Sequence, residues 1–478
     1  MVLTKFTTIA LLVAVALASS ADASATPRAV VDARIHRTLR AQSTVNILVT
    51  LKQDTSDVLS SVKEASFESR GAKIQALVNK LQTHAMTSQA EVAKIAQQES
   101  GSATPLYTKS ESFWISNQVY FKDATIELVE KLAGLSSVAD IREEEVIKAP
   151  TLTADSGVAA ANATATATAE WGVAKVKAPE AWAKGYLGQG IVVGGIDTGV
   201  RGTHEALKAN WRPSYGWFDP TASKTEPYDD QGHGSHTIGS AVGSKGIGVA
   251  PGAQWIACRS CTSDLCTQSA LLACGQFMTC PTDPSGKNPD CSQAPHVVNN
   301  SWGGSGETFY DNIIKAWTAA GIIPVFSAGN SGLGGCATTD WPGNRVDVIA
   351  VGATDVNDKL GFLSSKGPAS TGTIKPDITA PGMNVRSASF NTDTAYKLDM
   401  GTSMAAPHVA GVVALMLSVN PKLSFNQVRD ILTTTTDVNT LQASGYTCGS
   451  TLDTTFPNNQ YGYGRVNALN AVLKAKSA

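Results

Sequence analysis

The segment from residue 44 to 146 arranges its hydrophobic and polar positions in a way that predicts a small mixed unit. Residues 45–51 place apolar side chains at every second position, which is typical of a half-buried strand. Apolar residues recur at helical spacing over 74–85. A further strand, a short amphipathic helix and a last strand are predicted at 113–121, 126–132 and 138–141. This order indicates a small α+β, ferredoxin-like sandwich.

From residue 171 onward the pattern changes to continuous apolar runs separated by helical stretches. Runs that predict buried strands lie at 191–196, 255–257, 297–298, 322–326 and 348–351. Helical patterns lie at 265–277, 309–319 and 402–417. Strands that alternate with helices predict an α/β domain of three layers, in which helices cover both faces of a central, mostly parallel and twisted sheet. Chemistry is then expected at the carboxyl ends of the strands.

The two patterned regions are separated by residues 149–170, which consist almost entirely of Ala, Thr, Ser and Gly. No apolar periodicity runs through them, so we expect a flexible linker that is open to proteolysis. The linker contains Asn162-Ala163-Thr164, a sequence that accepts N-linked glycans in exported proteins. The unit before the linker and the domain after it are therefore expected to be separable.

The first 23 residues have the features of an export signal. Lys5 precedes an apolar run over 9–18, and Ala21-Asp22-Ala23 offers a cleavage site of small residues. A membrane anchor is the alternative, but the run is too short to span a bilayer. The 38 basic and 40 acidic residues among 478 give a net charge of −2, which provides no reason to expect a nucleic-acid or membrane partner. We expect a secreted protein.

The eight cysteines agree with export. All lie in the second half of the chain, and an even number in an exported chain predicts disulfides. The spacing Cys258-x-x-Cys261 leaves a zinc site as an alternative, although no second such pair follows. Eight cysteines allow many pairings, so the sequence does not choose among them.

Ser403 lies in the stretch 401–411, where a buried helix is expected to begin. Pro407 is best tolerated near a helix start. The free N–H groups of a helix start also suit developing negative charge. Taken alone, however, Ser403 has a simpler interpretation as a capping serine on a core helix.

Three other residues change that interpretation. Asp197 ends a predicted strand, His233 lies in a loop, and Asn330 follows the strand predicted at 322–326. Cleavage of an amide by acyl transfer needs a nucleophile, a base, a carboxylate that orients the base, and donors for the oxyanion. One residue of each type is present, and the order Asp, His, Ser is known for such triads. Each residue has a structural explanation separately, but together they predict catalysis.

The sequence around these positions resembles the signature motifs of the subtilisin-like serine proteases, the subtilases. The resemblance covers residues 170–470 and rests on five motifs: Asp197-Thr198-Gly199, His233-Gly234-Ser235-His236, 297–304, Ala328-Gly329-Asn330 and 401–411. Residues 171–173 and 177–179 are similar to the start of mature members, and 203–208 and 226–230 resemble the bacillopeptidase F-like branch.

The resemblance implies a role for each matched catalytic residue. Asp197 would orient His233, and His233 would activate Ser403. Asn330 and the backbone N–H of Ser403 would bind the oxyanion. The chain would thus be a secreted serine endopeptidase that acts on proteins or peptides. His236 and His408 match structural positions and are expected to serve packing.

On the substrate side, the resemblance implies that Ser301, Trp302 and Gly303 pair with the substrate backbone as an added strand. Residues 335–343 resemble the far wall of the specificity pocket, with Asp340 near its base. A carboxylate there would favour Lys or Arg in the residue that donates the scissile carbonyl. The alternative is a solvent-facing aspartate in a turn.

The resemblance also assigns the units. Residues 24–148, with a folded unit at 44–146, would be an inhibitory propeptide that acts on its own chain. Autoprocessing would occur in the linker at 149–170, and residues 171–478 would form the peptidase domain. The mature enzyme is expected to be a monomer.

No cofactor is required by this chemistry. Residues 241–251 are shorter than in subtilisins that carry a calcium loop at this place, so that tight site is expected to be missing. Asp377 matches a position tied to a weaker cation site, but one carboxylate is not a site, so a weak structural calcium stays open. Disulfides in the cysteine-rich insert at 258–291 are expected to tie down surface loops instead.

Two other function classes stay open. A lipase or esterase would use Gly-x-Ser-x-Gly and the order Ser, Asp, His, whereas here the serine comes last and Ala405 stands where that motif has glycine. A binding protein built on an inactive protease fold would lack one of the four residues, and all four are present. Labelling by a fluorophosphonate separates the classes, because only a working catalytic serine reacts.

Overall fold

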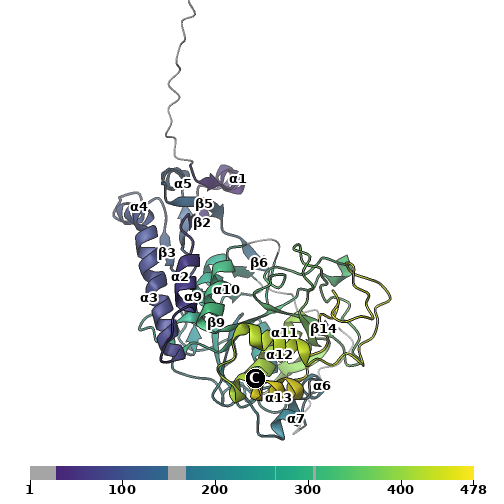
Figure 1. Cartoon of the computed structure of the whole chain (residues 1–478). Helices are drawn as coiled ribbons and strands as arrows, with labels where there is room; N and C mark the ends of the chain where they lie inside the picture. Colours follow the sequence, from purple (N-terminus) through teal and green to yellow (C-terminus); the bar gives the residue numbers. More distant parts are fainter. Residues whose placement is uncertain (1–27, 149–167, 264, 305–307) are drawn as a thin grey trace, which may run out of the picture.

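The computed structural model describes residues 28–148, 168–263, 265–304 and 308–478. The export signal expected at 1–23, the glycosylation sequence and most of the linker lie outside the described residues. Two units pack against each other (Figure 1). The smaller unit, in purple and blue, ends at residue 148, and the larger unit, in teal to yellow, contains the long helix α11 (Thr402–Val419).

The small unit has a ferredoxin-like sheet, as predicted. Its strand order is β1-β5-β2-β4-β3, and β2 (Val45–Leu51) pairs antiparallel with both β4 (Gln118–Ala124) and β5 (Val138–Glu143). Apart from the short edge strand β1 (Val30–Val31), this is the order of a β-α-β-β-α-β sandwich. Its helices are α1 (Ala33–Ala41), α2 (Ser56–Lys63), α3 (Arg70–Ser88), α4 (Ala90–Ser100) and α5 (Ile126–Ala133).

The prediction of a single strand over 113–121 is wrong. This region is a hairpin of β3 (Lys109–Phe113) and β4, joined by a turn at 114–117. Asn117 has a φ of 53° in that turn, a left-handed conformation that Asn tolerates better than most residues. Ile115 made the apolar run look continuous, but it is buried from within the turn.

The larger unit is an α/β domain, which confirms the predicted fold class. Its sheet has the order β15-β14-β13-β12-β7-β9-β8, and all neighbouring strands are parallel. Five of these strands are buried along their whole length, and burial on both faces of the sheet is why most of it appears as continuous apolar runs. The strands are β7 (Val192–Asp197), β8 (Trp217–Phe218), β9 (Gln254–Arg259), β12 (Val297–Asn300), β13 (Ile323–Ser327), β14 (Ile349–Thr354) and β15 (Ile378–Pro381).

Helices cover both faces of this sheet. Val193 and Val325 belong to one hydrophobic cluster, whereas the adjacent residues Val192 and Phe326 belong to another. Because successive residues of a strand point to opposite faces, the two clusters lie on opposite sides of the sheet. The first cluster includes residues of α8 (His233–Val242), α11, α12 (Phe425–Thr434) and α13 (Ala468–Lys476), and the second includes residues of α9 (Gln268–Thr279) and α10 (Asp311–Ala320).

Helix α11 lies at the centre of the first cluster. Its length and its mean hydropathy of 1.5 would fit a membrane span, but 89% of it is buried inside the fold. It is therefore a core helix, and it carries Ser403 at its second position.

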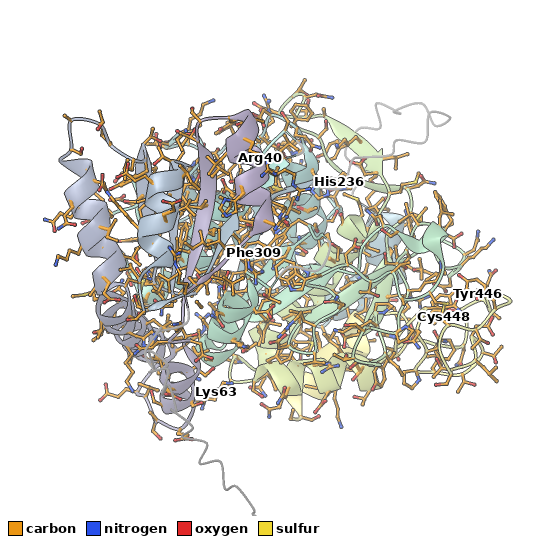
Figure 2. The ribbon with its side chains drawn as sticks, turned by 90° about the horizontal axis from the view of Figure 1, so that it is seen from above. Arg40, Lys63, His236, Phe309, Tyr446 and Cys448 are labelled. Atoms are coloured by element: carbon orange, nitrogen blue, oxygen red, sulfur yellow. A yellow bond between two sulfur atoms is a disulfide. The ribbon has the colours of Figure 1, made fainter. Side chains whose placement is uncertain are left out.

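The small unit packs on α9 and α10. Its residues Leu48 and Tyr120 share one hydrophobic cluster with Leu271 and Tyr310 of the larger unit. Figure 1 shows α2 and α3 beside α9 and α10. Figure 2, seen from above, places Phe309 at the boundary between the units, whereas Tyr446 and Cys448 lie at the far end of the larger unit.

The boundary between the units combines charged contacts with incomplete packing. The Arg70 guanidinium donates to the carbonyl oxygen of Ala294 at 2.9 Å and also to that of Pro295. Glu144 accepts from the N–H and the hydroxyl of Ser269, at 3.0 and 2.5 Å, where the free N–H groups at the start of α9 attract a carboxylate. Three cavities of about 210, 230 and 390 Å³ lie along this boundary, each lined by residues of both units.

The end of the small unit continues onto the larger one. Strand β6 (Val146–Lys148) pairs antiparallel with β11 (Leu265–Thr267), which forms a hairpin with β10 (Cys261–Thr262). The helix predicted at 265–277 therefore begins only at Gln268, because its first residues form an edge strand. Ile147 is buried, pairs with Cys266 and also lies against Gly304.

Candidate active site

Asp197 and His233 form a buried pair at the carboxyl edge of the sheet. Asp197 is the last residue of β7 and His233 the first of α8. His233 Nδ1 lies 2.8 and 2.9 Å from the two carboxylate oxygens of Asp197. Burial opposes protonation of His233, but the charge and hydrogen bond of Asp197 outweigh it, so the pKa of His233 lies above its ordinary value of 6.5. The contact with Asp197 fixes the orientation of the His233 ring and leaves Nε2 as the nitrogen that does not face the carboxylate.

Asp229 holds these two residues in place, a role that the sequence did not indicate. Its Oδ1 accepts from the Thr198 hydroxyl at 3.0 Å and from the N–H of Gly232 at 2.7 Å. Its Oδ2 accepts from the N–H and the hydroxyl of Ser235, at 2.9 and 2.7 Å. The carboxylate thus joins the residue after Asp197 to the first turn of α8. Only its place in the loop before His233 could have suggested this role.

Ser403 occupies the first turn of α11, next to the segment that directly follows β12. Its hydroxyl donates to the carbonyl oxygen of Ser301 at 3.2 Å. The described residues provide no hydrogen-bond partner for His233 Nε2, which is buried. The structure therefore joins His233 to Asp197 by hydrogen bonds and shows none between Ser403 and His233; in catalytic sites such a contact often forms only with substrate present.

Pro407 explains how the carbonyl of Ser403 is held. It lies inside α11 rather than at its first position, and a proline there cannot donate to the carbonyl four residues earlier, which belongs to Ser403. That carbonyl oxygen instead accepts from the Ser301 hydroxyl at 2.9 Å. The proline thus leaves free an acceptor that ties Ser403 to the segment predicted to bind the substrate.

Asn330 follows β13 and faces the start of α11. Its Oδ1 accepts from the N–H and the hydroxyl of Thr402, at 2.9 and 3.0 Å. The Thr402 hydroxyl in turn accepts from the N–H of Gly329 at 3.1 Å. With Oδ1 engaged, Nδ2 is left as a donor near Gly401, where an added Cβ would lie 3.2 Å from it. Nδ2 and the N–H of Ser403 are two donors suited to one oxyanion.

The predicted substrate residues Ser301, Trp302 and Gly303 directly follow β12. The Trp302 side chain is buried against Tyr310 and Phe326, with ring centroids 5.1 and 5.4 Å away. Only the backbone of this segment is therefore suited to meet a substrate. Strand β11 is the other edge to which an extended substrate could add, and β6 is already paired with it.

The two remaining motif histidines are buried in packing positions. His236 Nε2 lies 3.0 Å from the carbonyl oxygen of Val385, and His408 Nδ1 lies 2.8 Å from that of Met404. Burial lowers the pKa of each imidazole to about 4. Both are thus neutral at ordinary pH.

Asp377, the candidate cation ligand, is already paired with side-chain cations. Lys375 Nζ donates to its Oδ2 at 2.6 Å, and Arg429 Nη2 donates to its Oδ1 at 2.7 Å. The N–H of Ala350 also donates to Oδ2, at 2.9 Å. Within the described part of the chain, no group of three or more His, Cys, Asp or Glu side chains is placed to hold a metal ion.

All eight cysteines form disulfides: Cys258–Cys274, Cys261–Cys266, Cys280–Cys291 and Cys336–Cys448. Cys258 and Cys261 belong to different bonds, so the zinc alternative is wrong. Cys261–Cys266 spans the β10–β11 hairpin, and Cys336–Cys448 ties the segment after Asn330 to the C-terminal part of the chain.

The chain belongs to the subtilase family, whose model matches residues 188–464. Bacillopeptidase F of Bacillus subtilis (strain 168) is 38% identical over 440 residues, which cover 86% of this chain and 29% of that longer protein. Subtilisin DY of Bacillus licheniformis is 34% identical over 275 residues, covering 56% of this chain and 91% of the relative. Subtilisin BL of Lederbergia lenta is 34% identical over 303 residues, covering 62% and 96%. The predicted family is thus confirmed, and it places the chain among hydrolases that act on peptide bonds.

Proposed function

We propose that this protein is a secreted serine endopeptidase, made as a zymogen, that cleaves proteins through Asp197, His233 and Ser403. The observation that carries the proposal is the convergence of the buried Asp197–His233 pair, the helix-start Ser403 and the free amide donor of Asn330 at one edge of the sheet. Export is supported by the N-terminal sequence and the four disulfides.

The reaction begins when the Ser403 hydroxyl turns from the Ser301 carbonyl toward His233. As Oγ bonds to the scissile carbonyl carbon, its proton passes to Nε2, and the carboxylate of Asp197 stabilises the resulting imidazolium. The carbonyl oxygen becomes an oxyanion held by Asn330 Nδ2 and the Ser403 N–H. His233 then gives the proton to the leaving amine, and water releases the acyl group from Ser403 by the same steps in reverse.

The small unit is proposed to inhibit this site on its own chain. A substrate would add to β11 as a strand, and β6 already makes that pairing through Val146–Lys148. Substrate and small unit therefore compete for one edge. Release follows cleavage in the linker at 149–170, and the mature domain is proposed to act as a monomer.

The decisive test is Ser403→Ala, compared with the unchanged chain for fluorophosphonate labelling and for processing. The unchanged chain is expected to be labelled at Ser403 and to separate from its small unit. The variant is expected to fold, to remain unlabelled and to keep the small unit attached. Normal maturation of the variant would contradict autoprocessing, labelling with activity on esters only would identify an esterase, and no labelling of the unchanged chain would identify an inactive binding protein.

The proposed chemistry uses no cofactor, and we propose that Asp377 takes no calcium. Lys375 and Arg429 supply the positive charges that a cation would bring to it. Melting of the mature enzyme in EDTA and in millimolar calcium is expected to give the same Tm. A calcium-dependent rise that is lost in Asp377→Asn would show that Asp377 binds the ion.

A further inference from the structure

Strand β11 has little backbone support of its own once the small unit has left. It belongs to a sheet of the order β10-β11-β6, which is separate from the seven-stranded sheet of the larger unit. Among the described residues of the larger unit, β11 pairs with β10 alone, through Cys261↔Cys266 and Thr262↔Leu265. A hairpin of this length is at best marginally stable in water. The strand therefore needs other support to stay extended in the mature domain.

Two disulfides close this hairpin, one inside the other. Cys261–Cys266 joins two residues that pair across it, with a separation of 5 residues. Cys258–Cys274 joins the end of β9 to α9, with a separation of 16 residues, and so encloses the whole hairpin. All four cysteines are at most 1% exposed. The two bonds thus lie in the interior, where they restrain the backbone of β11 from both sides.

The base of the hairpin is fixed beside Asp197. Cys258 pairs with Ile196, the neighbour of Asp197 in β7. The N–H of Ser260 donates to the carbonyl oxygen of Asp197 at 2.9 Å. The outer disulfide therefore connects α9, which begins directly after β11, to the strand that lies next to Asp197.

Cys266 is also the residue of β11 that meets the centre of the small unit's last strand. It pairs with Ile147 of β6. An added Cβ on Gly304 would lie 3.7 Å from Ile147, so Ile147 lies between β11 and the segment that begins at Ser301. Ser301 contacts the Ser403 hydroxyl. A substrate residue in the place of Ile147 therefore lies about three residues, roughly 10 Å, before the scissile bond.

We propose that Cys261–Cys266 and Cys258–Cys274 are positioning residues for the reaction. They hold β11 extended in the mature enzyme, so that it pairs with substrate residues before the scissile bond without first having to become ordered. The inference rests on the proposed function and deepens it, because it names the cysteines that prepare the substrate edge. A strand ordered in advance leaves the binding energy of these remote residues available at the scissile bond.

The test varies the length of the substrate. Peptides share one cleaved bond, and they either reach only Ser301–Gly303 or extend far enough to pair with β11 as well. Active mature enzyme is counted by fluorophosphonate titration, and kcat and KM are measured for the unchanged chain and for two paired variants. Cys261→Ser with Cys266→Ser opens the inner bond. Cys280→Ser with Cys291→Ser is the matched control, because it removes a buried disulfide of the same insert at the far end of α9.

The unchanged enzyme is expected to cleave the long peptide with a kcat/KM about 10- to 100-fold above that of the short one, the worth of two backbone hydrogen bonds. Opening Cys261–Cys266 should remove most of this gain, because ordering the three residues of β11 on binding costs as much as the new bonds supply. The rate on the short peptide should stay within about twofold. The control variant should keep the gain.

A gain that survives in the opened variant would overturn the assignment of the disulfides alone. An equal loss on both peptides would overturn it too, because the bond would then support the triad rather than β11. If the variant does not mature, the unchanged mature enzyme is reduced with a phosphine and alkylated, and loss of the gain should follow alkylation of Cys266, located by mass spectrometry. A full gain in the alkylated enzyme would again contradict the inference. Absence of titratable serine in the unchanged chain would instead overturn the proposed function.

Discussion

The carboxyl edge of the large sheet and the boundary between the two units are built in different ways. At the edge, Asp197, Asp229 and Asn330 each accept two or more hydrogen bonds from their own domain. At the boundary, Arg70 and Glu144 bind backbone and helix-end groups of the larger unit directly, and cavities of up to about 390 Å³ lie along the same boundary. Unfilled volume costs dispersion contacts. The arrangement at the edge is therefore suited to a site that keeps its geometry, and the boundary is suited to two units that separate.

The largest expected effect of a substitution is at the carboxyl edge of the large sheet. His233→Ala should lower kcat by about 10⁶-fold, the loss that removal of this residue causes in subtilisin, because no other base replaces Nε2. Rates under saturating substrate, normalised to folded protein, measure the effect. A loss below about 10³-fold would show that His233 is not the base.

Asn330→Ala should have the next largest effect. Removing one oxyanion donor costs about 10²–10³-fold in kcat, with little change in KM, because the donor acts on charge that exists only in the transition state. Thr402→Val is the matched control, since it removes one bond to Oδ1 but leaves Nδ2 in place. An equal loss in both variants would mean that Asn330 acts by supporting α11 rather than by binding the oxyanion.

At the boundary, Arg70→Ala should weaken self-inhibition by about 10- to 100-fold, the worth of charged hydrogen bonds. The full chain is expected to show a shorter lag before activity appears, with the same final rate per titrated serine. Arg40→Ala, an exposed cation of the same unit that contacts no described residue of the larger one, should leave the lag unchanged. Unchanged lag in both variants would place the inhibitory contacts elsewhere, at β6.

A smaller effect concerns pH. His233 must be neutral to accept a proton, and its folded pKa lies above 6.5. Activity should therefore be present above that pKa and fall as pH drops through it, so the acid limb of kcat/KM lies above pH 6.5. Asp197→Asn should move the limb to lower pH, because the carboxylate raises the pKa of the histidine. A limb that does not move would assign it to another group.

The pattern of apolar residues along the sequence predicted most of the large sheet, because a strand buried on both faces needs an unbroken apolar run. The same pattern located Asp197 at the end of β7. It failed where contacts between distant residues decide the structure. The strand at 265–267 looked helical because only the pairing of β6 with β11 makes it extended. The sequence did not indicate the roles of Asp229 and Pro407. These roles depend on hydrogen bonds from Ser235 and Ser301, which form only in the folded chain.

The disulfides have a consequence for the lifetime of such an enzyme. A peptidase at high concentration is exposed to its own copies, and cleavage requires a segment to open locally before it enters a cleft. Cys258–Cys274, Cys261–Cys266 and Cys280–Cys291 close short loops in one insert, with separations of 16, 5 and 11 residues. Cys336–Cys448 joins segments 112 residues apart. Because these bonds limit local opening of the segments that they join, we expect them to slow self-digestion.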